Sequence, residues 1–295
     1  MSDVGGQAVS TASTAAWRRK LVPYGLLLPG GLWLVIFFVV PMLRLVSVSL
    51  QTGIFPGYRF AWEWSNYGEL FTKYGQQALN SILFAFAATA IALLISYPLA
   101  YFIAFRGGRW KNFLLVMLLM PFLMPFLLRT LSWKIILADN GLVVGVLRSL
   151  HLLADDGRLL ATGIAVVAGI TYNFLAFMTL PIYVSLEKID RALVEAAQDL
   201  YASPAVAFRK VTFPLSRPGV VAGTLLTFIP AVGDYVNAVL LGTPKEFMIG
   251  NVIQSRFLVV LDYPVAAALS FTLMLVTVLM VIPYVRATGT EDLVA

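Results

Sequence analysis

The sequence predicts an all-α integral membrane protein with six transmembrane helices. Three observations support this fold class: 60% of the 295 residues are hydrophobic, only 12% are charged, and the apolar residues gather in long runs. Soluble domains carry about 25% charged residues, and an apolar run of about 20 residues can cross the hydrocarbon core as a helix. The net charge of +6 then indicates basic loops at a membrane surface rather than binding to nucleic acid.

The six expected spans are separated by polar connections. Their approximate limits are Leu26–Leu50, Ala78–Phe105, Phe113–Ile136, Leu159–Leu186, Gly219–Leu241 and Pro264–Val285. Prolines inside them, such as Pro121 and Pro125, are expected to mark kinks, since neighbouring groups can satisfy the backbone that a proline frees. The expected organisation is therefore a tail at 1–20, a membrane domain at 21–287 with a polar segment at 187–218, and a second tail at 288–295.

The start of the chain also resembles a signal peptide, because Arg18, Arg19 and Lys20 precede an apolar stretch. That stretch is too long for a signal core and lacks a convincing small-residue cleavage site. We therefore expect the first span to be retained as a transmembrane helix.

Basic residues predict the orientation in the cell membrane. With the N-terminus inside, cytoplasmic segments hold twelve Lys and Arg residues and outer segments hold six. Cytoplasmic loops are enriched in these residues. Both termini and the segment 187–218 are therefore expected to face the cytoplasm.

The polar segment contains the stretch "EAAQDLYASPAVAFRKVTFPLSRPG", residues 195–219. Good helix formers run from Glu195 to Tyr201, and Ser203 followed by Pro204 predicts the cap and first residue of a second short helix. Pro214 and Pro218 are expected to break the chain before the fifth span. Two short helices across the end of a bundle form a surface for another protein, although an ordinary connector remains an alternative.

This segment resembles the EAA motif of ABC-importer permeases, in which Glu-Ala-Ala is followed by three residues, Gly, nine residues and Ile-x-Leu-Pro. Glu195-Ala196-Ala197 matches, Tyr201 takes the glycine position, and "VTFP" ends the pattern at Pro214. In that family the segment docks on the ATPase subunit. The resemblance implies this coupling role for Glu195, Ala196, Ala197, Asp199, Tyr201, Ala202, Ser203 and Pro214.

Tyr201 departs from the family pattern. Glycine permits a turn with positive φ or a close approach, whereas tyrosine is costly at positive φ. Either the turn is ordinary in this chain or the docking surface is reshaped. The family pattern predicts that the substitution Tyr201→Gly is tolerated.

Three further stretches look like polyamine (spermidine/putrescine) permeases of the first-subunit type. They are "LRTLSWKIILADNGLV" (128–143), "FIPAVGDYVNAVLLGTPKEFMIGNVIQSRF" (228–257) and "LDYPVAAALS" (261–270). With the EAA-like segment, the resemblance covers most of residues 17–287. It implies a type I importer fold, a second homologous permease subunit, two ATPase subunits and an extracytoplasmic solute-binding protein. The implied solute is a small cation such as a polyamine, with a sugar, an iron chelate or another organic cation as alternatives.

Several chemistries have no motif in this chain. No glycine is followed by lysine, so no phosphate loop of the Walker A type exists, and ATP and Mg are expected on the partner ATPase. The chain has no cysteine, and His151, its one histidine, is expected to be solvated in an outer loop. We therefore expect no catalytic site, no metal site and no cofactor in this chain.

Asp234 is the candidate substrate-path residue, with Tyr235 and Asn237 beside it. A carboxylate inside a membrane span usually faces a polar cavity or a partner. The alternative is a supporting role, for example in a pair with Arg129 or Lys134. An ion-coupled secondary transporter is a rival class, but the chain shows one intramembrane acid and no evident repeat. A membrane enzyme would need a catalytic cluster, and none is apparent.

Overall fold

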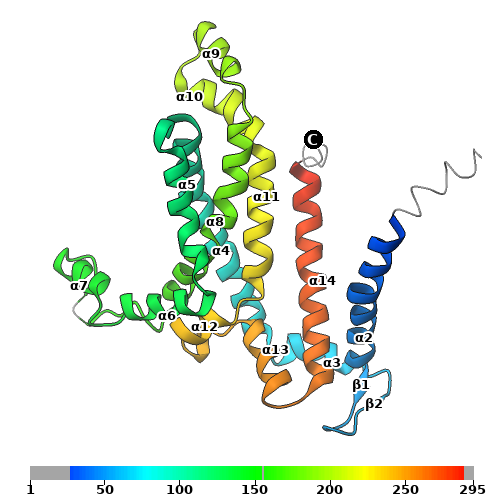
Figure 1. Ribbon diagram of the computed structural model, residues 1–295. Coiled ribbons are helices and arrows are strands. Elements are labelled where there is room, and N and C mark those ends of the chain that lie inside the picture. Colours follow the sequence, from blue (N-terminus) through cyan, green and yellow to red (C-terminus); the bar gives the residue numbers. More distant parts are fainter. Residues whose placement is uncertain (1–26, 155, 289–295) are drawn as a thin grey trace, which may run out of the picture.

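The computed structural model describes residues 27–154 and 156–288, and these residues fold into a bundle of helices with one small hairpin (Figure 1). Five helices are long and apolar enough to cross a membrane, and a sharply bent pair supplies the sixth candidate span. The all-α membrane fold is thereby confirmed. The five long helices are Leu27–Ser49, Gly75–Arg106, Gly163–Glu187, Pro204–Val232 and Tyr263–Ala287.

The structural elements have the following limits. They are α2 (Val40–Ser49), β1 (Gln51–Thr52), β2 (Arg59–Phe60), α3 (Ser65–Thr72), α4 (Gly75–Tyr101), α5 (Lys111–Leu119), α6 (Phe126–Ile136), α7 (Leu142–Ser149), α8 (Gly163–Glu187), α9 (Arg191–Asp199), α10 (Pro204–Ala207), α11 (Phe213–Val232), α12 (Val236–Leu241), α13 (Ile249–Leu258) and α14 (Tyr263–Thr288). The strands pair antiparallel with Gln51 opposite Phe60.

The centre of the molecule is the packing of α8 against α4 and α11. Two glycines of α11, Gly219 and Gly223, lie one turn apart and face α8. A Cβ atom at Gly223 would lie 2.8 Å from the carbonyl oxygen of Met178, and one at Gly219 would come closer still to that of Pro181. Small residues at this spacing let two membrane helices approach closely, so that van der Waals packing stabilises the pair.

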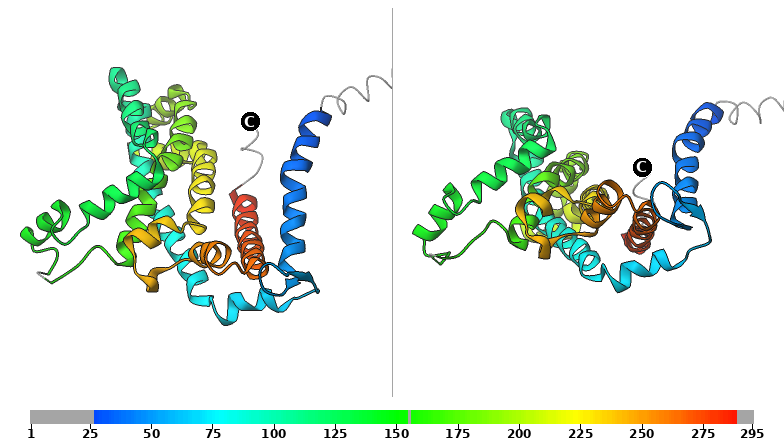
Figure 2. Two further views of the ribbon diagram at one scale, coloured as in Figure 1. Left: turned by 60° about the horizontal axis from the view of Figure 1, so that its bottom comes forward. Right: turned by 90° about the horizontal axis from the view of Figure 1, so that it is seen from below.

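The third expected span, Phe113–Ile136, is bent far more sharply than the kink expected at its prolines. The helix Gly108–Leu123 and α6 meet at an angle of 95°, and Met124 and Pro125 between them have extended backbones. Pro125 has no N–H and disfavours helical geometry at Met124. As a result, α6 and α7 project sideways from the bundle (Figures 1 and 2).

The fifth expected span, Gly219–Leu241, is wrong at both ends. The helix begins at Pro204 and ends at Val232, and a short break precedes α12. Pro214 and Pro218 do not break it. The turn Phe208–Thr212 before Pro214 is π-helical, with the N–H of Phe213 bonded to the carbonyl of Phe208, and such a turn can accommodate the amide that proline lacks.

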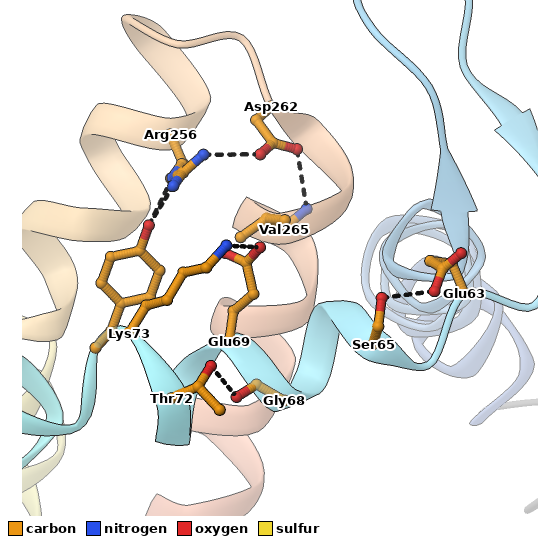
Figure 3. Close-up of polar contacts among 10 residues, drawn as sticks. Glu63, Ser65, Gly68, Glu69, Thr72, Lys73, Arg256, Asp262 and Val265 are labelled. Atoms are coloured by element: carbon orange, nitrogen blue, oxygen red, sulfur yellow. Dashed lines mark hydrogen bonds and ion pairs between the residues drawn. The ribbon is translucent and has the colours of Figure 1, made fainter.

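On the other side of the molecule, α14 packs against α2, α3 and α13. The guanidinium of Arg256 on α13 binds the Tyr74 hydroxyl through Nε (2.9 Å) and the Asp262 carboxylate through Nη1 (2.9 Å). Beside it, Lys73 pairs with Glu69 at 2.7 Å (Figure 3). The bond between Arg256 and Tyr74 joins α13 to the corner between α3 and α4.

Because α8 and α11 touch at Gly223, Gly223→Ala is expected to lower the free energy of unfolding by about 1–3 kcal/mol. Gly145→Ala is the matched control, since nothing lies within 4 Å of a Cβ atom at that helical position. Thermal unfolding of the purified protein in detergent measures both. Equal melting temperatures for the two variants would contradict the close contact between α8 and α11.

Candidate functional site

The first part of the candidate site is α9, which lies at one end of the bundle (Figure 1). Asp190 sets its start, because the Oδ1 atom accepts a hydrogen bond from the N–H of Ala192 at 3.0 Å, and a side chain that satisfies a free amide favours helix initiation. The helix therefore begins four residues before Glu195, the position from which the sequence predicts it. Arg191 anchors this end, with Nη2 donating to the carbonyl of Ala104 at 3.3 Å.

None of the nine residues of α9 is buried. Val194 and Ala197 are half-buried on the inner side, whereas Leu193, Glu195, Ala196 and Asp199 are exposed. Isolated helices of this length are marginal in water, so a helix with so little packing is suited to stabilisation by another protein.

Glu195 is exposed, and its carboxylate makes no hydrogen bond or ion pair with the residues that the structure describes. Within this part of the chain, the carboxylate therefore pairs with neither Arg191 nor Arg209. The carboxylate is free to accept hydrogen bonds from a partner.

The turn after α9 has a left-handed residue, because Tyr201 has φ +62°. The N–H of Tyr201 donates to Gln198 O (2.9 Å) and that of Ala202 donates to Ala197 O (3.1 Å). This pair of bonds defines the Schellman helix end, whose left-handed position usually holds glycine. The turn is therefore not ordinary, and tyrosine occupies a position that favours glycine.

The second short helix begins as the sequence predicts. The Oγ atom of Ser203 accepts from the N–H of Val206 at 3.4 Å, and Pro204 is the first helical residue, so the predicted cap is confirmed. The helix is continuous with α11, and Pro214 lies within its first turn. A single rod of 29 residues thus joins the turn at Tyr201 to the break at Gly233.

The second part of the site is the buried polar cluster, which consists of Asp234, Asn237, Thr130 and Asn173. The carboxylate of Asp234 accepts from the backbone N–H and from Nδ2 of Asn237, both at 2.8 Å. The Oδ1 atom of Asn237 accepts from Thr130 at 3.3 Å and from Asn173 at 3.2 Å. The cluster joins α6, α8 and α12 at the end of the bundle opposite α9 (Figure 1).

Asp234 therefore lies in the break between α11 and α12 rather than inside a continuous span. It is 7% exposed, and within the described part of the chain it forms no ion pair with Arg129 or Lys134. Its carboxylate caps α12 and remains without a counter-charge there. Tyr235 beside it is exposed, and its carbonyl accepts from Asn251 at 2.8 Å.

Arg129 has an unusual environment for a cation. The side chain lies over the rings of Phe122 (4.8 Å) and Phe126 (5.7 Å). Its Nε and Nη1 atoms are buried and have no hydrogen-bond partner among the described residues. Cation–π contacts with the two rings offset part of the cost of burying the charge.

The sequence did not single out Thr130 and Asn173. An amide within the apolar helix α8 was a signal that could have identified Asn173, because membrane spans seldom hold such groups without a partner. Thr130 gave no such signal, since a threonine hydroxyl commonly binds its own helix, as this one does at the carbonyl of Phe126. In the described residues, no group of three or more His, Cys, Asp or Glu side chains is placed to hold a metal ion.

This bundle of candidate membrane spans, with a largely exposed helix at one end, defines an integral membrane protein. Residues 96–285 match the family described as "Binding-protein-dependent transport system inner membrane component". The match covers more than half of the chain, and the chain belongs to this family. It is a multi-pass inner-membrane transport subunit and not an enzyme.

Particular relatives extend the similarity over most of the length. The chain is 37% identical over 257 residues to the spermidine/putrescine transport system permease protein PotB of Haemophilus influenzae, covering 86% of this chain and 90% of the relative. PotB of Escherichia coli K12 is 37% identical over 257 residues, covering 86% and 94%. The fold is also similar to that of a bacterial ABC transporter that imports alginate, with a TM-score of 0.67, 17% identity and coverage of 94% and 98%.

Proposed function

We propose that this chain is the transmembrane permease subunit of an ATP-driven importer for a small cationic solute, a polyamine such as spermidine or putrescine. The observation that carries this proposal is the 37% identity to PotB permeases over 86% of the chain, because it spans both parts of the candidate site. Two ATPase subunits, a second homologous permease and an extracytoplasmic binding protein complete the proposed importer. ATP and Mg belong to the ATPase subunits.

The proposed orientation places α9 and both termini in the cytoplasm. The final turns of α14 and the Leu27 end of the first helix lie at the same end as α9 (Figure 1). Arg191, Arg209 and Lys210 belong to this end, and an excess of basic residues favours the cytoplasmic side.

In this proposal, α9 and the turn after it dock on the ATPase subunit. The support is physical: α9 buries no residue, and Glu195 presents a free carboxylate. Leu193, Ala196 and Leu200 follow one another at intervals of three and four residues, which places them along one face of the helix. An exposed apolar stripe beside a free charge suits insertion into a groove of another protein.

The rod Pro204–Val232 provides a mechanical link between the two parts of the site. At about 1.5 Å per residue its 29 residues span about 43 Å. A displacement of the docking end therefore moves the Gly233 break, and with it the buried polar cluster. We propose that this link couples ATP hydrolysis to the opening of the solute path.

Asp234 is the proposed contact for the cationic solute, with Tyr235 and Asn237 beside it. A buried carboxylate without a counter-charge attracts a cation more strongly than an exposed one, because Coulomb attraction scales inversely with the effective dielectric constant. The hydrogen bonds from Asn237 hold the carboxylate in place. The exposed ring of Tyr235 offers a cation–π face for a second ammonium group.

The docking role predicts that Glu195→Ala weakens binding of the ATPase subunit. Loss of a hydrogen bond to a charged group costs about 1.5–3 kcal/mol, which corresponds to about a 10- to 150-fold weaker association. The substitution Ala197→Trp should also weaken binding, because a bulky side chain at this half-buried position displaces α9 from the residues it packs against. Co-purification of the ATPase subunit with tagged permease measures both effects.

The matched control for Glu195→Ala is Glu63→Ala, which removes a carboxylate that accepts a hydrogen bond from Ser65 (Figure 3). Glu63 lies between β2 and α3, at the end of the molecule opposite α9 (Figure 1). This variant should leave recovery of the ATPase subunit unchanged. Undiminished recovery and normal ATP-driven uptake with both α9 variants would contradict the docking role.

The path role predicts that Asp234→Asn lowers spermidine uptake at least about tenfold, because the variant keeps the size but loses the charge. The assembled importer should still be recovered. Uptake of radiolabelled spermidine into proteoliposomes measures the effect, with Asp139→Asn as the control for loss of an exposed carboxylate. Normal uptake by Asp234→Asn, together with failed assembly of Asp234→Leu, would contradict the path role and show that Asp234 acts only as a helix cap.

A further inference from the structure

Tyr201 has a backbone conformation that tyrosine disfavours and a side chain that is exposed. Its φ of +62° lies in the left-handed region, which disfavours residues with a Cβ atom by about 1–2 kcal/mol. Its side chain is 99% exposed, so contacts within the described chain do not offset this cost. Backbone strain without internal compensation is most often found where a residue serves a functional contact.

The turn positions the tyrosine ring at the end of the exposed face of α9. Leu200, the residue before it, is 82% exposed, and its position continues the stripe formed by Leu193 and Ala196. The two backbone hydrogen bonds of the helix end, from Tyr201 to Gln198 and from Ala202 to Ala197, hold the turn in one conformation. The ring is therefore presented on a defined backbone rather than on a free loop.

An exposed tyrosine is well suited to anchoring a protein interface. Tyrosine is enriched among the residues that dominate binding energy, because its large ring loses little conformational entropy when it is buried. A glycine in the same position would relieve the strain but offer no side chain to a partner. Tyrosine at this position thus lowers the stability of the turn but exposes a large aromatic ring.

We propose that Tyr201 is a specificity-determining anchor that inserts into a pocket of the ATPase subunit beyond the groove occupied by α9. This inference rests on the proposed docking of α9. The chain then selects an ATPase subunit that has a pocket for an aromatic ring at the end of the groove. A subunit shaped for glycine at this position lacks such a pocket and binds more weakly.

The test uses the full-length permease in nanodiscs and the ATPase subunit that co-purifies with the wild-type chain, with the dissociation constant measured by titration. Tyr201→Gly and Tyr201→Asn both suit a left-handed backbone and lack the ring, and each should weaken binding at least about tenfold. Tyr201→Phe keeps the ring and should bind within about threefold of the wild type. With the ATPase subunit in saturating excess, Tyr201→Gly should still support uptake.

Trp62→Gly is the matched control. Trp62 is also an exposed aromatic residue with a left-handed backbone, at φ +49°, and it lies next to β2 at the opposite end of the molecule. Its replacement should leave the dissociation constant unchanged.

Wild-type affinity of Tyr201→Gly for the ATPase subunit would overturn this inference and leave the docking of α9 intact. Failure of the wild-type permease to bind any ATPase subunit would overturn the proposed function, and this inference with it.

Discussion

The contact between α8 and α11 determines where both parts of the candidate site lie. Gly219 and Gly223 remove the side chains that would separate the two helices, so that α11 lies against the carbonyls of Pro181 and Met178. In a bilayer such packing replaces the hydrophobic driving force that holds soluble cores together. Because α11 belongs to a continuous helix that begins at Pro204, this contact positions the turn at Tyr201 and the break at Gly233 together.

The second constraint is that polar groups within the membrane need partners inside the protein. The break after Val232 is stable because Asp234 accepts two hydrogen bonds from Asn237, and Asn237 in turn binds Thr130 and Asn173. The same cluster fixes α6 after its turn out of the bundle. The carboxylate of Asp234 is thus held in a fixed position by the hydrogen bonds of the cluster.

The sequence predicted the fold class, most of the spans and the cap at Ser203, because hydrophobic length and capping chemistry are local properties. It predicted a kink at Pro121 and Pro125 but not the 95° angle that forms there, since a proline in a membrane helix is compatible with a slight kink as well as with a sharp turn. Pro214 was predicted to break the chain, but a π-helical turn accommodates it and the helix continues. The break at Gly233 also went unrecognised, although glycine followed by aspartate is a common way to end one helix and cap the next.

The candidate site was accessible to sequence reasoning only in part. Asp234 stands out as a charge within an apolar run, and the resemblance to importer permeases implied the coupling role of Glu195. The left-handed backbone of Tyr201 depends on the hydrogen bonds that close the end of α9, and Asn173 meets Asn237 only through the packing of α8 against α12. Such contacts between distant residues require the three-dimensional structure.

The central claim is that α9 and the turn after it face the compartment that contains the ATPase subunit. The chain has no cysteine, so single cysteines introduced by Ala205→Cys near the turn and by Ala61→Cys next to β2 can be labelled without background. Both alanines are exposed. In right-side-out vesicles a membrane-impermeant maleimide should label only Ala61→Cys, and in inside-out vesicles only Ala205→Cys. Labelling of Ala205→Cys from the outside alone would contradict the orientation and the docking role together.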